Sequence, residues 1–395
     1  MRKKIVISVN TAWNVCNFRA GLVRALVRQG YDVLVLAGAD DYVSQLAGLG
    51  CGFKKLALDN HGTNASRDLA LLVKYWRVLQ SVRPLAYLGF TIKPNVYGSI
   101  AASAQAIPVI NNVAGLGATF MHGTMLTEFV KQLYRLSLRR SSQVFFQNRD
   151  DRQLFVDAGL ARAGVTDVLP GSGIDLQHFT PFPMMPHDDG SFRFLLVARM
   201  LKDKGIEEYV AAARIVRQHL PWVQFQLLGA VDVENPNGIP ASRLAEWESS
   251  GLIRYLNRVD DVRPHLAQAD CIVLPSYREG VPHSLLEAAA TARPIIATDV
   301  AGCRDIVDED GNGFLCRVKS APDLADKMIR MAQLAPEQRL RMGAAGRDKV
   351  VREFDEGIVI GRYLKAIGRI EEAQAAAPRT GPPLVHAASA NTMPE

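Results

Sequence analysis

Apolar runs of strand length alternate with helical patterns along this chain, and the alternation occurs twice. The first series ends at a stretch rich in proline and turn residues, 179–190, and a second series begins at Phe192. Strands that alternate with helices form parallel sheets with helices on both faces. A chain of 395 residues is also too long for one ordinary domain. We therefore predict an α/β protein with two doubly wound, Rossmann-like domains that face each other across a cleft.

The strand candidates divide equally between the two series. Those of the first series cover residues 4–10, 31–38, 53–58, 85–90, 108–113 and 143–148. Those of the second series cover residues 192–198, 225–228, 253–256, 271–275, 294–298 and 313–317. Helical patterns lie at residues 19–29, 66–82, 126–141 and 150–158, and again between 321 and 375.

These patterns predict five parts of the chain. Residues 1–180 form an N-terminal Rossmann-like domain, 181–190 a linker, and 191–354 a C-terminal Rossmann-like domain. A helix at 355–374 then packs back towards the N-terminal domain. The last stretch, 375–395, is rich in alanine and proline without periodicity, and we expect it to be disordered.

The composition excludes several classes of protein. With 48% hydrophobic and 22% charged residues the chain can bury a core, and it holds no apolar run long enough to cross a membrane. The basic and then apolar start, 1–10, resembles a signal peptide, but its apolar run is too short, so we interpret it as the first strand of a cytoplasmic protein. The cysteines include no Cys-x-x-Cys pair, which indicates neither a disulfide framework nor a zinc site.

The two halves of the chain differ in charge. Residues 1–180 carry 20 lysines and arginines against 11 acidic residues, whereas residues 181–395 carry 26 against 29. A basic half can meet nucleic acid, anionic lipid or an anionic substrate, and the sign alone does not choose among them. Because the basic half contains no recognisable helix-turn-helix or RNA-binding module, nucleic acid is not an expected partner.

The segment 274–290 combines the end of a strand, a loop and the start of a helix. Glu279 and Gly280 lie in the loop, and Glu287 follows near the helix start. Loop amides and a helix N-terminus attract phosphate or sugar hydroxyls, and carboxylates accept hydrogen bonds from a diol. In the alternative, Ser284 and Glu287 form a capping box that only satisfies the helix start. That alternative leaves Glu279 and Gly280 unexplained.

A second candidate site lies between the strand at 192–198 and the helix that follows Gly205. Arg199 comes just after the strand, and Lys204 directly precedes the glycine. Two cations beside a helix N-terminus suit a diphosphate, and each charge-assisted hydrogen bond contributes about 1.5–3 kcal/mol. A solvated turn accounts for the same residues equally well.

Together these segments resemble the family 4 retaining glycosyltransferases, which have the GT-B fold. The resemblance rests on Glu279-x7-Glu287 with its Glu-Gly-Val-Pro and Leu-Leu-Glu-Ala surroundings, and on Arg199 with Lys204. Asp299-Val-Ala-Gly302 also looks like the glycine-containing donor loop of that family. The resemblance extends over residues 1–372 and is most specific in the C-terminal half. It implies that the domain at 1–180 binds the acceptor and the domain at 191–354 binds the nucleotide sugar.

The resemblance implies a role for each of these residues. Arg199 and Lys204 would bind the diphosphate of a nucleotide sugar and stabilise it as it leaves. Glu279 would contact the transferred sugar, which makes it the third catalytic residue, and Glu287 would bind the ribose hydroxyls. The backbone amides that would touch the sugar or phosphate are those near Gly280, Val281 and Gly302. No metal and no other cofactor is implied, because the two cations take the place of a metal.

Four segments of the first half resemble bacterial members of the family that extend polyprenyl-diphosphate-linked surface glycans with an N-acetylhexosamine. These segments are 90–95, 115–117, 146–151 and 170–175. Thr91, Lys93 and Asn95 follow a strand, so we place them on the acceptor side of the cleft. Lys93 either binds the acceptor pyrophosphate or only enters a helix. Gly171 and Gly173 form either a backbone cradle towards the donor phosphate or a plain turn.

The chain departs from the family pattern after its first strand. Many relatives have a Gly-Gly pair there, whereas this chain has a loop, 11–19, that contains no glycine. Asn17 and Arg19 are candidates to replace those glycines on the acceptor side. Ala114 stands where close relatives can carry a carboxylate or a histidine, and His122 is more readily a structural or solvated residue than a base. We therefore assign no acid or base to the N-terminal domain.

The helical pattern at 126–141 carries basic residues beside apolar ones, namely Lys131, Arg135, Arg139 and Arg140. Such a segment either lies on an anionic bilayer next to a lipid acceptor or is an ordinary surface helix. We predict transfer of a hexose or N-acetylhexosamine from a UDP-sugar to a polyprenyl-diphosphate-linked saccharide, by an enzyme bound peripherally at the cytoplasmic face of the membrane. The alternatives are a nucleotide-sugar epimerase or hydrolase on the same fold, and a non-catalytic nucleotide-sugar-binding protein.

Overall fold

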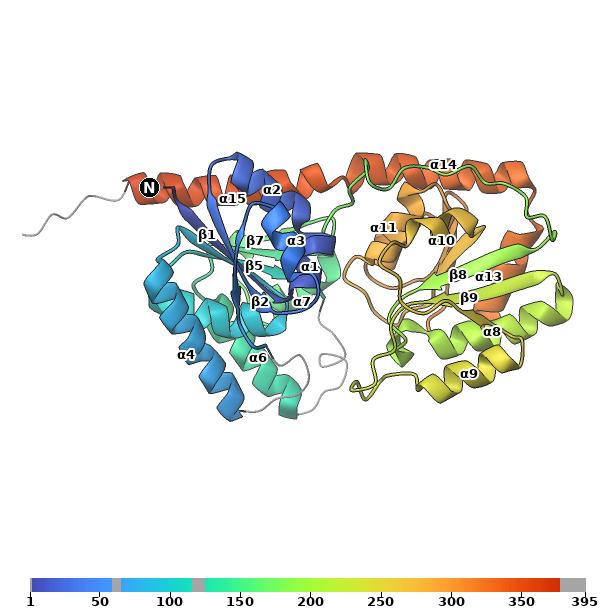
Figure 1. Ribbon diagram of the computed structural model, residues 1–395, viewed down its shortest axis with the longest axis horizontal. Coiled ribbons are helices and arrows are strands. Elements are labelled where there is room, and N and C mark those ends of the chain that lie inside the picture. The colour runs from blue at the N-terminus through green and yellow to red at the C-terminus, as the bar shows by residue number, and fades with distance from the viewer. Residues whose placement is uncertain (1, 59–64, 116–124, 377–395) are drawn as a thin grey trace, which may run out of the picture.

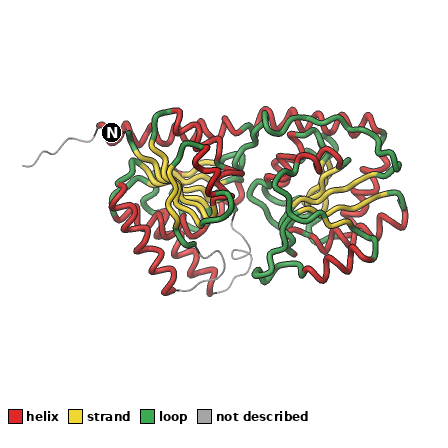
Figure 2. Tube along the Cα trace, viewed as in Figure 1, coloured by secondary structure: helices red, strands yellow, loops and turns green. Residues whose placement is uncertain are grey.

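The computed structural model describes residues 2–58, 65–115 and 125–376. They form two lobes that lie side by side, each built around one parallel sheet (Figure 1). Strands occupy the middle of each lobe, and helices lie on both sides of its sheet (Figure 2). The predicted α/β class with two doubly wound sheets is confirmed. Gly117, His122 and, from residue 377 onwards, the predicted tail lie outside the described residues.

The first lobe contains a seven-stranded sheet in the order β3-β2-β1-β4-β5-β6-β7. Its strands are β1 (Lys4–Thr11), β2 (Asp32–Gly38), β3 (Gly52–Lys55), β4 (Ala86–Phe90), β5 (Val109–Val113), β6 (Gln143–Phe146) and β7 (Thr166–Val168). The second lobe contains a six-stranded sheet in the order β10-β9-β8-β11-β12-β13. Its strands are β8 (Phe192–Val197), β9 (Val223–Leu228), β10 (Arg254–Tyr255), β11 (Cys271–Leu274), β12 (Ile295–Thr298) and β13 (Gly313–Cys316).

Both faces of the central strands are buried, which explains their unbroken apolar sequences. In β1, Ile5 and Ile7 pack into one cluster of the core, whereas Val6 packs into another cluster on the opposite face. Each strand that the sequence predicts corresponds to one of the observed strands. The sequence missed β7, because its three residues are only half-buried and give no hydrophobic pattern.

The helices of the first lobe are α1 (Ala12–Phe18), α2 (Ala20–Arg28), α3 (Val43–Gly48), α4 (Ala65–Val82), the π-helix η1 (Pro94–Gly98), α5 (Ser99–Ala104), α6 (Met125–Leu138), α7 (Arg149–Asp157) and the short 3-10 helix η3 (Ala163–Val165). In the second half they are the 3-10 helix η4 (Lys202–Lys204), α8 (Ile206–His219), α9 (Ala241–Ser249), α10 (Arg263–Gln268), α11 (His283–Ala290), α12 (Cys303–Ile306), α13 (Ala321–Gln333), α14 (Pro336–Glu353) and α15 (Glu356–Ala376). Within the described ranges, none of these helices is long and apolar enough to cross a membrane.

The stretch 11–19 corrects one prediction, because it is not a loop. Residues Ala12–Phe18 form α1 directly after β1, and the hydroxyl of Thr11 accepts a hydrogen bond from the backbone N–H of Asn14 at 3.2 Å. Threonine before a helix satisfies one of the free N–H groups of the first turn. This helix is hard to recognise in the sequence, since it lasts only two turns.

The C-terminal helices connect the two lobes. Helix α14 packs against α11 in the second lobe, whereas α15 places Val359, Tyr363 and Ile367 in the core of the first lobe (Figure 1). The chain passes between the lobes a second time near Ile174, whose backbone N–H donates to Phe354 at 2.8 Å. The two connections between the lobes are therefore hydrogen-bonded to each other.

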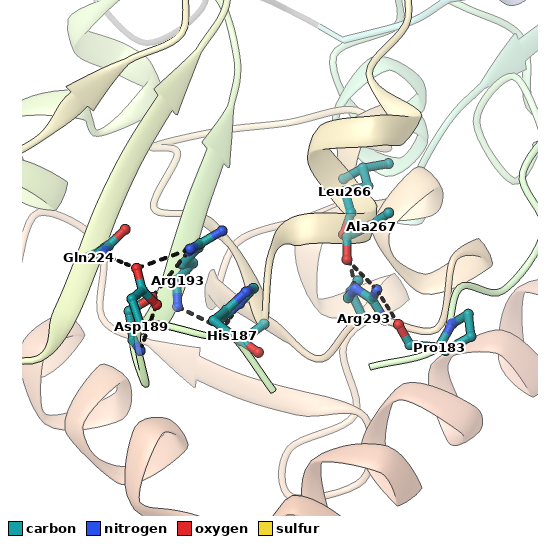
Figure 3. A network of polar contacts seen from close by, with 10 residues as sticks. Pro183, His187, Asp189, Arg193, Gln224, Leu266, Ala267 and Arg293 are labelled. Carbon is teal, nitrogen blue, oxygen red and sulfur yellow. Dashed lines mark hydrogen bonds and ion pairs between the residues drawn. The ribbon is translucent and has the colours of Figure 1, made fainter. Parts of the chain in front are cut away.

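The predicted linker 181–190 lies on the second lobe and is held there by polar contacts (Figure 3). Arg293 is almost fully buried and donates to the backbone carbonyls of Phe182 at 3.0 Å and Pro183 at 3.2 Å. Further along, His187 lies 3.0 Å from a carboxylate oxygen of Asp270. Burial lowers the pKa of Arg293, because a charged group loses hydration in the interior. The linker is thus attached to the second lobe rather than free between the two.

Candidate active site

Three loops meet at the carboxyl edge of the second sheet. They follow β8, β11 and β12, which are neighbours in that sheet, and they hold Arg199 with Lys204, Glu279 with Gly280, and Gly302. In open parallel sheets, ligands bind beyond this edge of the strands. The structure therefore brings together the residues that the sequence singled out in three separate segments.

Lys204 and Glu279 form an ion pair with an Nζ–Oε1 distance of 2.5 Å. Both side chains are largely buried, with 20% and 13% of their surface exposed. The turn that places Lys204 needs Gly205, which has a φ of 72° and no room for a Cβ beside the carbonyl of Pro275. The sequence predicted separate partners for these residues, namely a diphosphate for the ammonium and a sugar for the carboxylate. In the structure each fixes the position of the other.

Arg199 lies on the same edge but is more accessible. Its side chain is 60% exposed, and its guanidinium lies 3.3 Å from a carboxylate oxygen of Asp232. An exposed ion pair of this kind stabilises a fold by only about 0–1 kcal/mol. The guanidinium can therefore turn towards an anionic ligand at little cost.

Glu287 does not belong to a capping box. Helix α11 begins at His283, after Pro282, and no side chain caps it. Glu287 is therefore beyond the first turn, and its carboxylate lies 2.8 Å from Nδ1 of His283. The alternative in which Ser284 and Glu287 only cap the helix is wrong, because capping requires a carboxylate at the third helical position.

His283 is a site residue that the sequence reasoning missed. Besides its contact with Glu287, its ring packs against the ring of Phe18 from the first lobe, with centroids 4.9 Å apart. The signal was present, because a histidine four residues before a glutamate on a helix lies on the same face. Residues of both lobes therefore meet beside Glu287.

Glycines allow the loops of the site to approach one another closely. Gly302 has a φ of 79°, and a Cβ there would overlap the carbonyl oxygen of Gly280. Gly171, with a φ of 65°, faces Val281, whose Cβ would lie 2.8 Å from an added Cβ. Gly173 lies farther along, where an added Cβ would come within 2.5 Å of the Cα of Glu356. Gly171 therefore borders the loop that holds Gly280 and Val281, whereas Gly173 contacts the start of α15.

Asn17 lies in α1 at the boundary between the lobes. Its side chain donates to the carbonyl of Trp13 at 2.9 Å and lines a cavity of about 440 Å³ together with Tyr42, Arg258 and other residues. At this cavity the hydroxyl of Tyr42 donates to a carboxylate oxygen of Asp260 at 2.7 Å, which joins the two lobes. Asn17 is thus close to residues of both lobes.

Arg19 is a buried cation at the carboxyl edge of the first sheet, with 6% of its surface exposed. Its guanidinium carbon lies 4.6 Å from the centre of the Phe90 ring, and Nη1 donates to the carbonyl of Phe18 at 3.0 Å. Within the described residues it has no carboxylate partner. Burial lowers the pKa of Arg19, because the charged form loses hydration. A buried cation without a counter-ion is suited to an anionic ligand.

Thr91, Lys93 and Asn95 follow β4, as predicted, but their surroundings differ. Thr91 has a φ of 64°, and its buried hydroxyl has no partner among the described residues. Lys93 forms an ion pair of 2.9 Å with Asp68 of α4. Asn95 is buried, and its side chain donates to the carbonyl of Asn112 at 2.7 Å. Of the three, Thr91 has a buried hydroxyl without a partner among the described residues, whereas the other two hold elements of the first lobe together.

Two domain families match the chain, one in each lobe. The family described as glycosyl transferase 4-like domain matches residues 17–171, and the family described as glycosyl transferases group 1 matches residues 191–333. The chain belongs to the glycosyltransferases in which these two domains follow one another. Its pair of facing Rossmann-like lobes is the GT-B fold of such enzymes.

Curated relatives agree with this assignment. The chain is 28% identical over 379 residues to the N,N'-diacetylbacillosaminyl-diphospho-undecaprenol alpha-1,3-N-acetylgalactosaminyltransferase of Campylobacter jejuni, a match that covers 90% of this chain and 96% of the relative. It is 21% identical over 276 residues to the UDP-Gal:alpha-D-GlcNAc-diphosphoundecaprenol alpha-1,3-galactosyltransferase of Escherichia coli, a match that covers 67% of this chain and 70% of the relative.

Solved structures share the fold of the chain. Sucrose-phosphate synthase from Thermosynechococcus elongatus matches with a TM-score of 0.76 at 18% identity, covering 94% of this chain and all of that one. HepE of Anabaena in complex with UDP and glucose matches with a TM-score of 0.75 at 17% identity, and the match covers 95% of this chain and all of HepE. Both span the two lobes, so the arrangement of the lobes is also shared.

Proposed function

We propose that this protein transfers a hexose or N-acetylhexosamine from a UDP-sugar to a polyprenyl-diphosphate-linked saccharide. The substrate class is supported by the two curated relatives, whose names specify undecaprenyl-diphosphate-linked sugars. The observation that carries the proposal is the ion pair of Lys204 and Glu279 beside the accessible Arg199. These three groups lie together at the sheet edge where a nucleotide sugar would bind.

The two cations act on the leaving nucleotide. Negative charge develops on the diphosphate as the bond to the sugar breaks, and positioned cations stabilise the transition state more than the bound substrate. The Lys204 ammonium has three N–H groups and gives one to Glu279, so two remain for phosphate oxygens. Arg199 can leave Asp232 and complete the binding of the diphosphate.

The two glutamates would bind the rest of the donor. Glu279 keeps one carboxylate oxygen outside its 2.5 Å contact with Lys204, and this oxygen can accept a hydrogen bond from the sugar. Glu287, oriented by His283 at 2.8 Å, would accept hydrogen bonds from the ribose hydroxyls. Substitution on the same face of the sugar, through an oxocarbenium-like state and without a metal, is the retaining mechanism that we infer for this arrangement.

The acceptor would lie against the carboxyl edge of the first sheet. Arg19 supplies a buried cation there, and Thr91 supplies a hydroxyl without a partner among the described residues. Lys93 could bind the acceptor pyrophosphate only by sharing its ammonium with Asp68. Arg19 is therefore the better candidate for the anionic part of the acceptor.

We also propose that the first lobe rests on the inner face of the cytoplasmic membrane. Helices α4 and α6 lie on the same side of this lobe (Figure 1). Leu69, Val73 and Trp76 form an exposed apolar stripe on α4, and Phe129 and Leu136 are exposed on α6. Lysines and arginines accompany both, including Lys74 and Lys131. Apolar side chains that insert between lipids, together with basic ones that face anionic head groups, give reversible binding to a bilayer.

The function can be tested with a panel of radiolabelled UDP-hexoses and UDP-N-acetylhexosamines and with short polyprenyl-diphosphate-linked saccharides. We expect label in the lipid phase with at least one donor, and loss of that label in Lys204→Met. Lys202→Met is the matched control, because Lys202 lies in the same turn but is exposed. Donor consumption without labelled lipid would instead indicate an epimerase or a hydrolase. If the protein consumes none of the donors, its remaining role is to bind nucleotide sugars.

A further inference from the structure

The first lobe holds the backbone of the loop that carries Glu279. Nδ2 of Asn148 lies 3.4 Å from the carbonyl oxygen of Glu279 and 3.3 Å from that of Gly280. Oε1 of Gln147 accepts a hydrogen bond from the backbone N–H of Val281 at 3.2 Å. Gln147 and Asn148 follow β6 of the first sheet, whereas the loop follows β11 of the second. Three consecutive residues of the loop are thus bound by the other lobe.

An ion pair, buried on its carboxylate side, accompanies these hydrogen bonds. Asp151, in the first turn of α7, accepts a hydrogen bond from the guanidinium of Arg278, which directly precedes Glu279. The Asp151 side chain is 1% exposed. Breaking a buried pair by removing one partner is costly, because the other charge is left without compensation. Contacts between the lobes therefore lie at Glu279 and at the residues on both sides of it.

Capping of α7 explains only part of this arrangement. Oδ1 of Asn148 accepts a hydrogen bond from the backbone N–H of Asp151 at 2.7 Å, as expected of a residue that caps a helix. A serine would do the same. Nδ2 of Asn148 also lies 3.2 Å from Oδ2 of Asp151 on the same helix. Capping requires neither the contacts of Nδ2 with the carbonyls of the opposite loop nor a carboxylate that pairs with Arg278.

The loop at Gly280 packs closely against the first lobe. An added Cβ on Gly280 would overlap the carbonyl oxygen of Ala114 and would lie 2.6 Å from Oε1 of Gln147. On its other side, Gly280 contacts Gly302 of the second lobe. The loop is therefore confined between the two lobes, and its conformation depends on both.

We propose that Asn148 and Asp151 are positioning residues that couple closure of the lobes to the orientation of Glu279 towards Lys204. With the lobes apart, the loop loses its contacts to Gln147, Asn148 and Asp151, so the carboxylate is no longer held in place. The site is then complete only in the closed enzyme, so the donor is not activated while the open cleft still admits water. This inference rests on the proposed function, because it assigns Glu279 to the donor.

The test compares Asn148→Ser and Asp151→Asn with Asp150→Asn. Serine retains the cap of α7 but cannot reach the loop carbonyls. Asp150 is the matched control, because it also faces the second lobe but is exposed and lies 3.8 Å from Arg304. We expect the first two variants to lose about 100-fold in kcat/KM for the donor, since small displacements of a reacting group have effects of this size. The control should stay within about threefold of the wild type.

Two measurements do not depend on transfer to lipid. Calorimetry with UDP should show weaker binding in Asn148→Ser and Asp151→Asn, and X-ray scattering should show a larger radius of gyration. If both variants keep the UDP affinity and the radius of gyration of the wild type, the inference is wrong. A lower melting temperature as the only change would show that the two residues are structural, which also contradicts the inference. A wild-type protein that binds UDP but labels no lipid would instead contradict the proposed function and leave this comparison intact.

A double-mutant cycle tests whether Asp151 acts through Arg278. Asp151→Asn combined with Arg278→Met should lose no more than about threefold beyond Asp151→Asn alone, because residues that act as a pair are not additive. If the loss of kcat/KM in the double variant equals the product of the losses in the two single variants, the two residues act independently. That result would overturn the assignment of Asp151 as the partner that holds the loop.

Discussion

The carboxyl edges of the two sheets differ in how their polar groups are satisfied. At the second edge the carboxylates and the ammonium of the candidate site have partners in the protein: Lys204 pairs with Glu279, and Glu287 contacts His283. Only Oδ1 of Asp203 and Nε of Arg278 are buried without a partner in these loops, among the described residues. At the first edge several buried side-chain atoms have no partner within the described residues. These atoms belong to Asn10, Asn14, Arg19, Thr91 and Asn112, at or just after the ends of β1, β4 and β5.

The difference shows what holds the polar groups of each edge in position. A buried polar atom without a partner costs about 1–3 kcal/mol, so the first edge is maintained at the expense of stability. The unpaired polar atoms of the first edge gain hydrogen-bond partners only when water or a ligand binds there. The second edge is already arranged by its own ion pairs, and a ligand there only has to join them. We therefore expect substitutions at the second edge to impair catalysis most, and substitutions at the first edge to change acceptor binding and stability.

The largest effect should follow the removal of both donor cations. Arg199→Ala combined with Lys204→Met should lower kcat by at least about 1,000-fold, because one preorganised group that stabilises developing charge contributes about 100- to 1,000-fold. Initial rates of transfer from labelled UDP-sugar measure this loss. Lys202→Met, in the same turn, should keep the wild-type rate. If the double variant retains a tenth of the activity, the second edge does not hold the leaving group.

The next effect concerns the packing of the donor loops. Gly302→Ala should destabilise the protein by about 3 kcal/mol, because the Cβ meets the Gly280 carbonyl and the φ of 79° disfavours alanine. Gly251→Ala is the matched control, since Gly251 has a φ of 70° and no atom within 4 Å of an added Cβ. We expect it to cost about 1 kcal/mol. Denaturant unfolding of both variants separates the two contributions, and equal losses would show that the loops have room.

The sequence predicted the second edge better than the first for a physical reason. At the second edge the chemistry lies in short loops between strongly apolar strands, so both the strand ends and the charged residues are visible in the sequence. What it could not predict was the pairing of Lys204 with Glu279, because the two residues are 75 positions apart and meet only through the sheet order. A capping box at Ser284 fitted the spacing equally well until the true helix start, His283, was known.

At the first edge the sequence predicted the position of residues but not their partners. Lys93 and Asn95 follow a strand as expected, yet they bind Asp68 and Asn112 of the same lobe. Asn148 and Asp151 match the pattern of a helix cap, and nothing in the sequence indicates that they also face Arg278 of the other lobe. Contacts between lobes depend on how the lobes are placed, and local patterns carry no information about that placement.

A moderate effect should separate acceptor binding from donor binding at Arg19. Arg19→Met should raise KM for the lipid-linked acceptor about tenfold, since one charge-assisted hydrogen bond is lost, and should leave KM for the donor unchanged. The free energy of unfolding should change by less than about 1 kcal/mol, because the lost hydrogen bond is offset by the removal of a buried charge. Arg24→Met, on the exposed side of α2, is the control. If the KM for the donor rises instead, Arg19 binds the donor rather than the acceptor.

The smallest effect should appear at Thr91, where function and stability oppose each other. Thr91 is β-branched at a φ of 64°, so Thr91→Gly should raise the free energy of unfolding by about 1 kcal/mol. The same change removes a buried hydroxyl, and we expect KM for the acceptor to rise about threefold, since a neutral hydrogen bond contributes about 0.5–1.5 kcal/mol. Ala106→Gly, at a φ of 55° in the same lobe, should give the gain in stability without the change in KM. If Thr91→Gly also leaves KM unchanged, the strained conformation serves the fold alone, and the first edge contacts the acceptor through fewer groups than its unpaired atoms suggest.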